Sequence, residues 1–372
     1  MTMSDDPNPS GSGDRTAVSS PLLHLDERTT RRRLADNRPT TRMGRLAESF
    51  YYMRGRGAVE ITVVYVLILV LFLALFLQNS DPATGFPFWT QRNFTGTLTQ
   101  SIPFYALLAI GAGILMIAGE FDLSLGASLG FAGIVFIKTL NAGYAWPLAI
   151  VAAVASSTAI ALVNGVIVVT TQIPSFIATL GMSFFWNGAA LYINGLSPAI
   201  IESPNPTMTN VMAGIHGWFR SQFFWMIAVG FVAWWFLHRT KWGNHVYATG
   251  GNPLAAKAVS IKPNAVRLMS FAILGIMVGL AASLLVARTT TMQPATTDSR
   301  TLFAIAAAVV GGCLLTGGRG TVFGMIIGAA LIGTVENGFI LGRLPGFYLQ
   351  LFLGVTIVVA ATINKVMEGR AK

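Results

Sequence analysis

Three carboxylates that could do chemistry lie inside or at the edge of long apolar stretches: Glu120, Asp122 and Glu336. A charged side chain at the centre of a bilayer costs about 3 kcal/mol, so such residues are typical of proton relays and substrate paths. Asp122 has a structural alternative, because an apolar stretch follows it closely. Its carboxylate could accept the first N–H groups of a helix that begins there and favour the helix dipole.

Amide side chains lie within the same apolar stretches, at Asn164, Asn187 and Asn337. They could line a water-filled path through a membrane, or they could hydrogen-bond one helix to the next. A hydroxyl follows Asp122 by two positions. The candidates for a translocation path are therefore Glu120, Asp122, Ser124, Asn164, Asn187, Glu336 and Asn337.

Motifs for covalent, metal or nucleotide chemistry do not occur in the sequence. The four histidines lack zinc-ligand spacing, and neither a G-x-S-x-G nor an H-E-x-x-H motif is present. The glycine-rich run at residues 317–321 lacks the lysine spacing of a phosphate-binding loop, so any ATP must be hydrolysed by another chain. Cys313 suits a small apolar filler. We therefore expect no enzyme activity, no metal and no cofactor.

The composition indicates an all-α membrane protein. Of 372 residues, 53% are hydrophobic and 11% charged, and the mean hydropathy is +0.62, which is too apolar for an ordinary soluble domain. A helical span needs about 20 apolar residues. About ten spans are predicted, at residues 58–77, 100–118, 124–140, 145–169, 176–195, 219–237, 265–287, 302–316, 322–341 and 347–364.

Glycine spacing adds detail to these spans. The pairs Gly126/Gly130 and Gly324/Gly328 have the four-residue spacing that lets helices approach closely. The second and third spans resemble the eighth and ninth, which makes a parallel internal duplication conceivable. A re-entrant segment is an alternative for residues 119–124.

The basic residues predict the orientation of the chain, whose net charge is +10. With ten spans, most Lys and Arg residues fall on the side of both termini, which the positive-inside rule assigns to the cytoplasm. We expect contact with a lipid bilayer and none with nucleic acid. The predicted organisation is a disordered cytoplasmic tail at residues 1–57, a transmembrane domain at 58–364 and a cytoplasmic C-terminus at 365–372.

The basic inner loop at residues 238–265 is predicted to hold one short helix. Asn252 suits its N-cap and Pro253 its first position, and the helix should end by Ile261, before Pro263. Its small apolar surface suits insertion into a groove of a partner, although a basic loop could merely set the membrane topology. The loop residues of interest are Gly250, Gly251, Asn252, Pro253, Leu254, Ala255, Ala256, Lys257, Ser260 and Ile261.

Residues 248–261 (ATGGNPLAAKAVSI) resemble the coupling loop of the ribose-type permease subunits of bacterial ABC sugar importers. Two positions depart from that family, which often has Glu in place of Leu254 and usually Gly in place of Ser260. The resemblance covers about residues 100–362. It includes GEFDLSLG at residues 119–126, Asn164-Gly165, IPSFIATLG at 173–181, AIAAAVVGG at 304–312 and GGRG at 317–320.

One outer segment departs further from that pattern. Thr301 stands at a position where the family has Glu, and Phe303 where it usually has Asp. The preceding Arg300 changes the electrostatics of the outer gate, so the resemblance leaves the identity of the substrate open.

The resemblance implies a type II-like permease of about ten helices in the bacterial inner membrane, with cytoplasmic termini. It implies import of a monosaccharide of the ribose, xylose or fructose class, driven by separate ABC ATPase subunits docked at the coupling loop. A periplasmic sugar-binding protein and a second permease subunit, identical or related, are the other implied partners. One alternative is a proton-coupled secondary sugar transporter, with Glu120, Asp122 and Glu336 as proton carriers. The other is a membrane-embedded enzyme, for which the sequence contains no catalytic motif.

Overall fold

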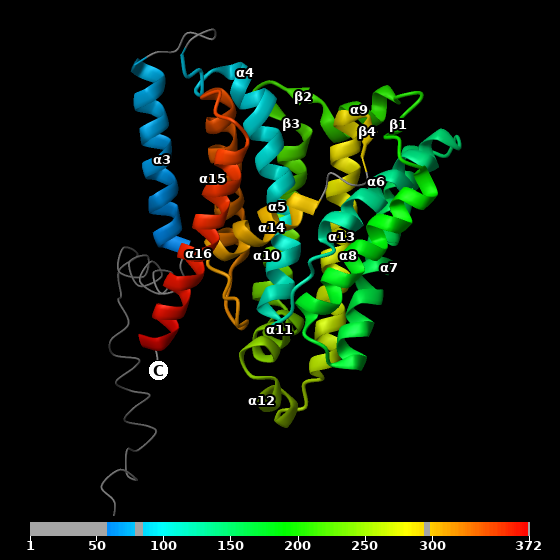
Figure 1. The fold of residues 1–372 in the computed structure, drawn as a ribbon, viewed down its shortest axis with the longest axis vertical. Coiled ribbons are helices and arrows are strands. Elements are labelled where there is room, and N and C mark those ends of the chain that lie inside the picture. Colours follow the sequence, from blue (N-terminus) through cyan, green and yellow to red (C-terminus); the bar gives the residue numbers. More distant parts are fainter. Residues whose placement is uncertain (1–57, 79–84, 294–297, 371–372) are drawn as a thin grey trace, which may run out of the picture. The chain divides into compact units, whose positions relative to one another are not determined.

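The computed structural model describes residues 58–78, 85–293 and 298–370. The tail predicted for residues 1–57 lies outside them, as do the last two residues of the chain. The chain divides after Tyr52, and all described residues belong to the second unit, Met53–Lys372. This unit is mostly helical (Figure 1), which confirms the predicted class.

The elements, in chain order, are α3 (Ala58–Gln78), α4 (Gln91–Asn93), the π-helix η1 (Phe94–Leu98), α5 (Thr99–Ile117), α6 (Leu125–Asn141), α7 (Trp146–Thr171), α8 (Ser175–Asn194), β1 (Ala199–Ile200), α9 (Pro206–Ala213), β2 (Ile215–His216), β3 (Phe219–Arg220), α10 (Ser221–Arg239), α11 (Lys241–Gly251), α12 (Pro253–Ala258), α13 (Pro263–Thr289), β4 (Thr291–Met292), α14 (Asp298–Val310), α15 (Val322–Leu341) and α16 (Phe347–Arg370).

Six of the described helical stretches are long and apolar enough to cross a bilayer: α7, α8, α10, α13, α15 and the continuous stretch Gln91–Ile117 that ends in α5. Four shorter apolar helices lie in α3, α6, α14 and α16. These ten match the predicted spans in position. The multi-span architecture is therefore confirmed, whereas a full crossing by each of the four shorter helices stays a prediction.

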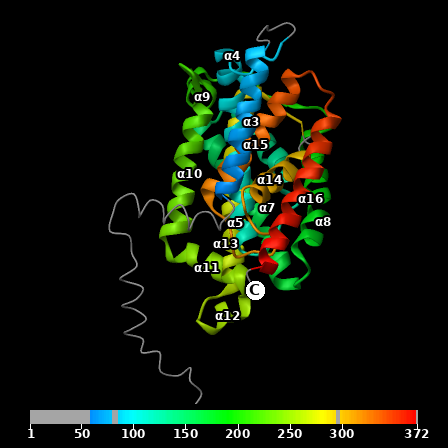
Figure 2. The same ribbon diagram turned by 90° about the vertical axis from the view of Figure 1, so that its left-hand side faces the viewer.

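The helices α5 and α13 lie at the centre of the unit (Figures 1 and 2). Nearly all of α5 is buried, and it packs against α10, α13, α14 and α15, while α13 also packs against α6 and α7. Gly275 and Gly279 let α13 approach α7, because a Cβ at either position would lie 2.5 Å from the Cα of Thr158 or Val154. By contrast, α8 exposes large apolar side chains such as Phe184 and Tyr192, as expected of a helix that faces lipid.

Two non-helical segments lie between helices of the core, and we call them the interrupted segments. After α5 the chain runs without helix through residues 118–124 before α6 begins, and after α14 it does so again through residues 311–321 before α15. The predicted span at residues 302–316 is wrong in its limits: α14 starts at Asp298 and ends at Val310, because Gly312 has a φ of +90°. Its 13 residues extend only about 20 Å, less than the bilayer core.

Both interruptions follow the same order, an apolar helix, a glycine turn and a glycine-spaced helix, as the sequence similarity of these regions indicates. Gly324 and Gly328 on α15 face α14, where a Cβ would overlap the carbonyl oxygens of Gly311 and Ala307. The predicted close packing at this pair is therefore confirmed.

The end opposite α12 carries more structure than the loops predicted there (Figure 1). In the connection between the predicted spans 176–195 and 219–237, the helix α9 is capped by the Asn205 side chain, which accepts a hydrogen bond from the Met208 N–H (3.1 Å). The strand β1 pairs antiparallel with β4, with Ala199 opposite Met292, and β2 pairs with β3. The β1–β4 pair lies against α6 and α13, whereas β3 lies against η1, α5 and α10.

Candidate functional site

The basic loop contains two helices, so the prediction of a single short helix is wrong. α10 leads directly into α11, and α12 follows at the lower end of the unit (Figure 2). Thr240 caps α11 by accepting a hydrogen bond from the Gly243 N–H (3.2 Å). Gly243 is needed at this corner, since a Cβ there would overlap the Leu237 carbonyl oxygen. Glycines of this kind concealed the helix at the sequence level, because glycine disfavours helix interiors.

The start of α12 agrees with the prediction. The Asn252 side chain accepts hydrogen bonds from the N–H groups of Leu254 (3.1 Å) and Ala255 (3.0 Å), and Pro253 occupies the first position. The end does not agree, because α12 stops at Ala258 rather than near Ile261. Ser260 adopts a φ of +65°, a conformation that favours glycine. This explains physically why the resembling family would use glycine at that position.

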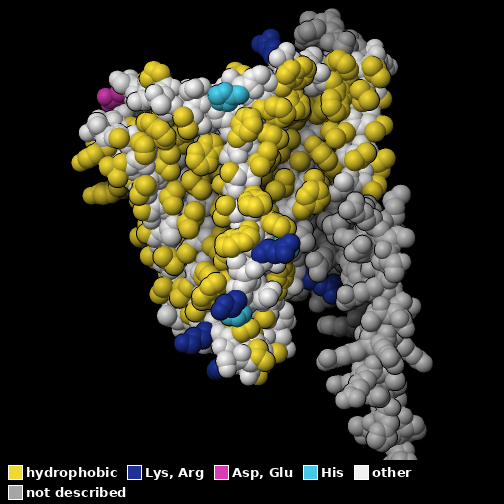
Figure 3. Space-filling model, turned by 180° about the vertical axis from the view of Figure 1, so that it is seen from behind, with side chains coloured by type: hydrophobic (Ala, Val, Ile, Leu, Met, Phe, Trp, Pro, Cys, Tyr) yellow, Lys and Arg dark blue, Asp and Glu magenta, His cyan; other side chains and the backbone are white. Residues whose placement is uncertain are grey.

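The predicted coupling residues divide into exposed and buried ones. Leu254 is 81% exposed and Val259 is 70% exposed, whereas Ala256 is buried against the rest of the chain. Exposed apolar side chains at a projecting end are typical of an interaction site. Lys and Arg side chains gather toward the same lower end of the face seen in Figure 3.

Three backbone segments meet where α11 ends, and we call this place the glycine junction: Ile117 to Gly119, Gly250 to Gly251, and Gly317 to Gly318. The Gly318 N–H donates to the Ile117 carbonyl oxygen (2.9 Å). A Cβ on Gly317 would lie 3.0 Å from the Gly119 Cα, and one on Gly250 would overlap the Ile117 carbonyl oxygen. The end of α11, which directly precedes the Asn252 cap of α12, is thereby packed against both interrupted segments, a contact that the sequence did not predict.

A buried polar cluster forms on the first interrupted segment. The Asp122 carboxylate accepts hydrogen bonds from the Ser124 N–H (2.7 Å) and hydroxyl (2.6 Å). The Asn164 amide donates to the Ser124 hydroxyl (2.6 Å) and to Asp122 (3.3 Å), and the Trp186 indole N–H donates to the Asn164 carbonyl oxygen (3.3 Å). Three of the predicted candidates therefore lie together, joined by a tryptophan that was not predicted.

The backbone of this segment is held by hydroxyl groups from two other helices. The Phe121 N–H donates to Ser175 (3.0 Å) and the Leu123 N–H to Thr179 (2.9 Å), both on α8. The Gly126 N–H donates to the Thr301 hydroxyl on α14 (2.8 Å). The four-residue spacing of Ser175 and Thr179, after a proline, is a sequence signal that could have indicated that both hydroxyl groups lie on one face of α8.

We expect Thr301→Val to lower the free energy of unfolding of the purified chain by about 1–3 kcal/mol, because the isosteric side chain leaves the buried Gly126 N–H without its acceptor. Thermal unfolding in detergent would measure this. Thr301→Ser keeps the hydroxyl and should lower the free energy of unfolding much less. Equal losses in the two variants would contradict the role of the hydroxyl.

Glu120 does not join the polar cluster. Its carboxylate forms an ion pair with the Arg267 guanidinium at the start of α13 (2.9 Å). This pair links the first interrupted segment to the first turns of α13, the helix that follows α12.

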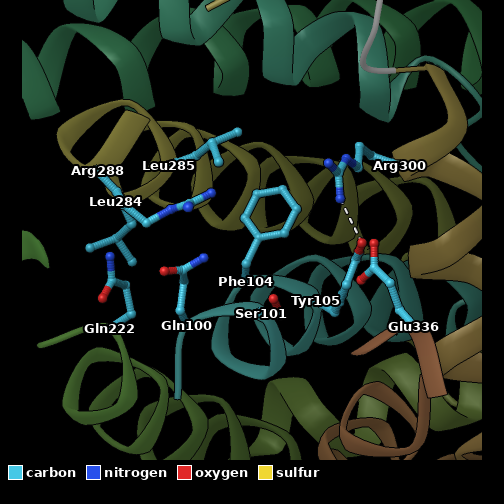
Figure 4. Close-up of a pocket in the computed structure, with 10 residues that line it drawn as sticks. All are labelled: Gln100, Ser101, Phe104, Tyr105, Gln222, Leu284, Leu285, Arg288, Arg300 and Glu336. Atoms are coloured by element: carbon cyan, nitrogen blue, oxygen red, sulfur yellow. Dashed lines mark hydrogen bonds between the residues drawn. The ribbon is translucent and has the colours of Figure 1, made fainter. Parts of the chain in front are cut away.

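The other three candidates are separate. The Asn337 amide donates to the Asn93 side chain (3.0 Å) and thus joins two helices, which fits the structural alternative. Asn187 is half-buried on α8, next to Trp186. Glu336 lines a cavity of about 200 Å³ between the outer ends of α5, α10, α13, α14 and α15 (Figure 4). The seven candidates therefore do not line one continuous path in this conformation.

Comparison with known proteins extends over most of the chain. The family described as "Branched-chain amino acid transport system / permease component" matches residues 93–361. The ribose import permease protein RbsC of Escherichia coli K12 is 32% identical over 286 residues, which are 74% of this chain and 87% of that protein. The autoinducer 2 import system permease protein LsrC of Salmonella typhimurium LT2 is 29% identical over 303 residues, 76% of this chain and 85% of that protein.

Proposed function

The chain belongs to the family of ribose-type permease subunits of ABC importers, and from this premise we propose that it forms the membrane path through which an importer moves a small hydroxylated substrate into the cytoplasm. The substrate class follows from the relatives, which import ribose and autoinducer 2. ATP hydrolysis belongs to separate subunits, and a multi-pass position in the inner membrane of a bacterium follows from the family and the apolar helices.

In the proposed orientation, α12 and both termini face the cytoplasm and the β1–β4 pairing faces the periplasm. The basic residues toward the α12 end support this orientation (Figure 3). The periplasmic binding protein would release its sugar at the outer ends of α5, α13 and α14. A second permease subunit, identical or related, would complete a type II-like pair.

The observation that carries the proposal is α12, a capped helix on which Leu254 is exposed, as is Val259 directly after it. We infer that this helix inserts into a groove of the ATPase subunit. Movement of the ATPase would then pass through the glycine junction to residues 118–124 and 311–321. Because these segments continue into α6 and α15, a displacement of α12 could shift the chain between an outward-open and an inward-open arrangement.

A proton-coupled secondary transporter is the competing function. Two of its three proposed carriers are held in other roles, since Glu120 is paired with Arg267 and Asp122 accepts hydrogen bonds from Ser124 and Asn164; the third, Glu336, lies apart from them in the cavity. The relatives are permeases of import systems, which also speaks against a chain that works alone.

Reconstitution in proteoliposomes tests the choice between the two functions. We expect labelled ribose to enter only when the chain is combined with its ATPase, its binding protein and ATP, and we expect an uncoupler to have no effect. Liposomes that lack the ATPase serve as the control. Sugar flux carried by the chain alone and abolished by an uncoupler would overturn the proposed function.

A further inference from the structure

The outer cavity is the place where this chain can select a substrate by charge. It opens near the end opposite α12 and brings together polar side chains from five helices around the Phe104 ring (Figure 4). Arg288 and Gln222 lie on one side of that ring, and Arg300 and Glu336 lie on the other. A volume of about 200 Å³ suits a small hydroxylated molecule better than a drug-sized ligand.

The two arginines carry more charge than the cavity neutralises. The Arg300 guanidinium donates to the Tyr105 hydroxyl and lies 5.5 Å from the centre of the Phe104 ring. Among the described residues, neither Arg288 nor Arg300 has a carboxylate oxygen within 4.0 Å, since the one such ion pair is that of Arg267 with Glu120. The single carboxylate of the cavity, Glu336, lies beside the Tyr105 hydroxyl (Figure 4).

Two further positive charges lie near Arg288. Arg220 and Arg300 lie close enough to act on it electrostatically. Its contact in the cavity is neutral: when the Gln100 amide oxygen faces it, that oxygen accepts a hydrogen bond from Arg288 (2.7 Å). Guanidinium groups prefer carboxylate or phosphate oxygens as acceptors, so an anionic group would be stabilised at this position.

Gln222 adds an unsatisfied acceptor. Its side chain lines the cavity, the residue is only 4% exposed, and its side-chain carbonyl oxygen has no hydrogen-bond partner within the described part of the chain. A buried carbonyl oxygen without a donor costs about 1–3 kcal/mol. A hydroxyl group of a ligand would supply that donor, and Glu336 could accept a second hydroxyl across the cavity.

We propose that this cavity binds a small polyhydroxylated anion of the sugar-acid class, with its carboxylate on Arg288 and Arg300 and its hydroxyl groups on Gln222 and Glu336. The proposal rests on the proposed function in placing the cavity on the side from which substrate arrives. It goes further in the charge of the substrate, because with a neutral sugar the Glu336 carboxylate remains the single counter-charge for two guanidinium groups among the lining residues.

Calorimetry on the full chain in phosphatidylcholine nanodiscs tests the proposal, with D-ribonate and D-ribose as probes that share one carbon skeleton. We expect D-ribonate to bind at least tenfold more tightly than D-ribose. The double variant Arg288→Gln/Arg300→Gln should lose this preference, and Arg288→Lys/Arg300→Lys should keep part of it. Gln222→Leu should weaken the binding of both probes. Equal binding of the probes, or a preference that survives the double glutamine variant, would overturn the proposal.

Two controls make the result specific. Arg92→Gln removes an exposed arginine that does not line the cavity and should change neither affinity. Nanodiscs of phosphatidylglycerol should keep the preference for D-ribonate over D-ribose, and loss of that preference there would instead identify an anionic lipid headgroup as the occupant. Because no ATPase takes part in these measurements, their failure would leave the proposed import function standing.

Discussion

Gly250→Ala is expected to remove most of the folded chain and with it ATP-driven uptake. The added methyl group would overlap the Ile117 carbonyl oxygen and approach the Gly318 nitrogen within 2.7 Å. Both are backbone atoms, so a side-chain rotation cannot relieve the overlap. Overpacking of a close-packed core usually costs about 1–3 kcal/mol, and we expect this substitution to reach or exceed the upper value.

The neighbouring position offers a matched control for this prediction. A Cβ on Gly251 would meet nothing within 4 Å, so Gly251→Ala makes the same chemical change one residue away and should fold and transport like the parent chain. The folded fraction follows from fluorescence-detected size exclusion, and uptake follows from the reconstituted importer. If both variants behaved alike, the close approach of the three segments at the glycine junction would be wrong.

Leu254→Arg is expected to abolish capture of the ATPase subunit by this chain. A buried apolar anchor of an interface typically contributes 2 kcal/mol or more, which corresponds to about 30-fold in Kd, and a charge in its place adds a desolvation penalty. Because Leu254 is 81% exposed in the single chain, the variant should fold normally. Co-purification of the ATPase with the tagged chain measures the effect.

Leu196→Arg is the matched control, since Leu196 is 90% exposed and lies outside the coupling loop. It should leave capture unchanged. Ala256→Arg is unsuitable for this purpose, because Ala256 is buried and the larger side chain would disturb α12 itself. Retention of the ATPase by Leu254→Arg would exclude docking through this helix.

These two predictions separate two steps of one mechanism. Leu254 concerns whether the ATPase attaches, and Gly250 concerns whether the glycine junction, through which a movement of α12 would have to pass, can form. Asp122 and Ser124 lie on one of these segments and are hydrogen-bonded to Asn164 on α7, so in the proposed mechanism a displacement of this segment would change these hydrogen bonds. The outer cavity lies near the end opposite α12; Thr301, the neighbour of the cavity residue Arg300, accepts a hydrogen bond from the Gly126 N–H at the start of α6.

The sequence by itself predicted the features that depend on short stretches of chain. Apolar length located the ten helical regions, and the pair Asn252-Pro253 located the start of α12, because a cap and its helix are neighbours in sequence. The coupling-loop resemblance led to the family that the comparisons confirm. Asp122, Ser124 and Asn164 were found because polar groups in apolar stretches are conspicuous.

The tertiary structure decided the features that join distant segments. The helix α11 forms despite Gly243, Gly250 and Gly251, since contacts across the chain outweigh the low helix propensity of glycine. The glycine junction, the hydroxyl groups that hold residues 118–124 and the outer cavity each combine segments more than 50 residues apart. Local patterns of residues do not specify such long-range contacts, because the packing between helices determines which polar groups face one another.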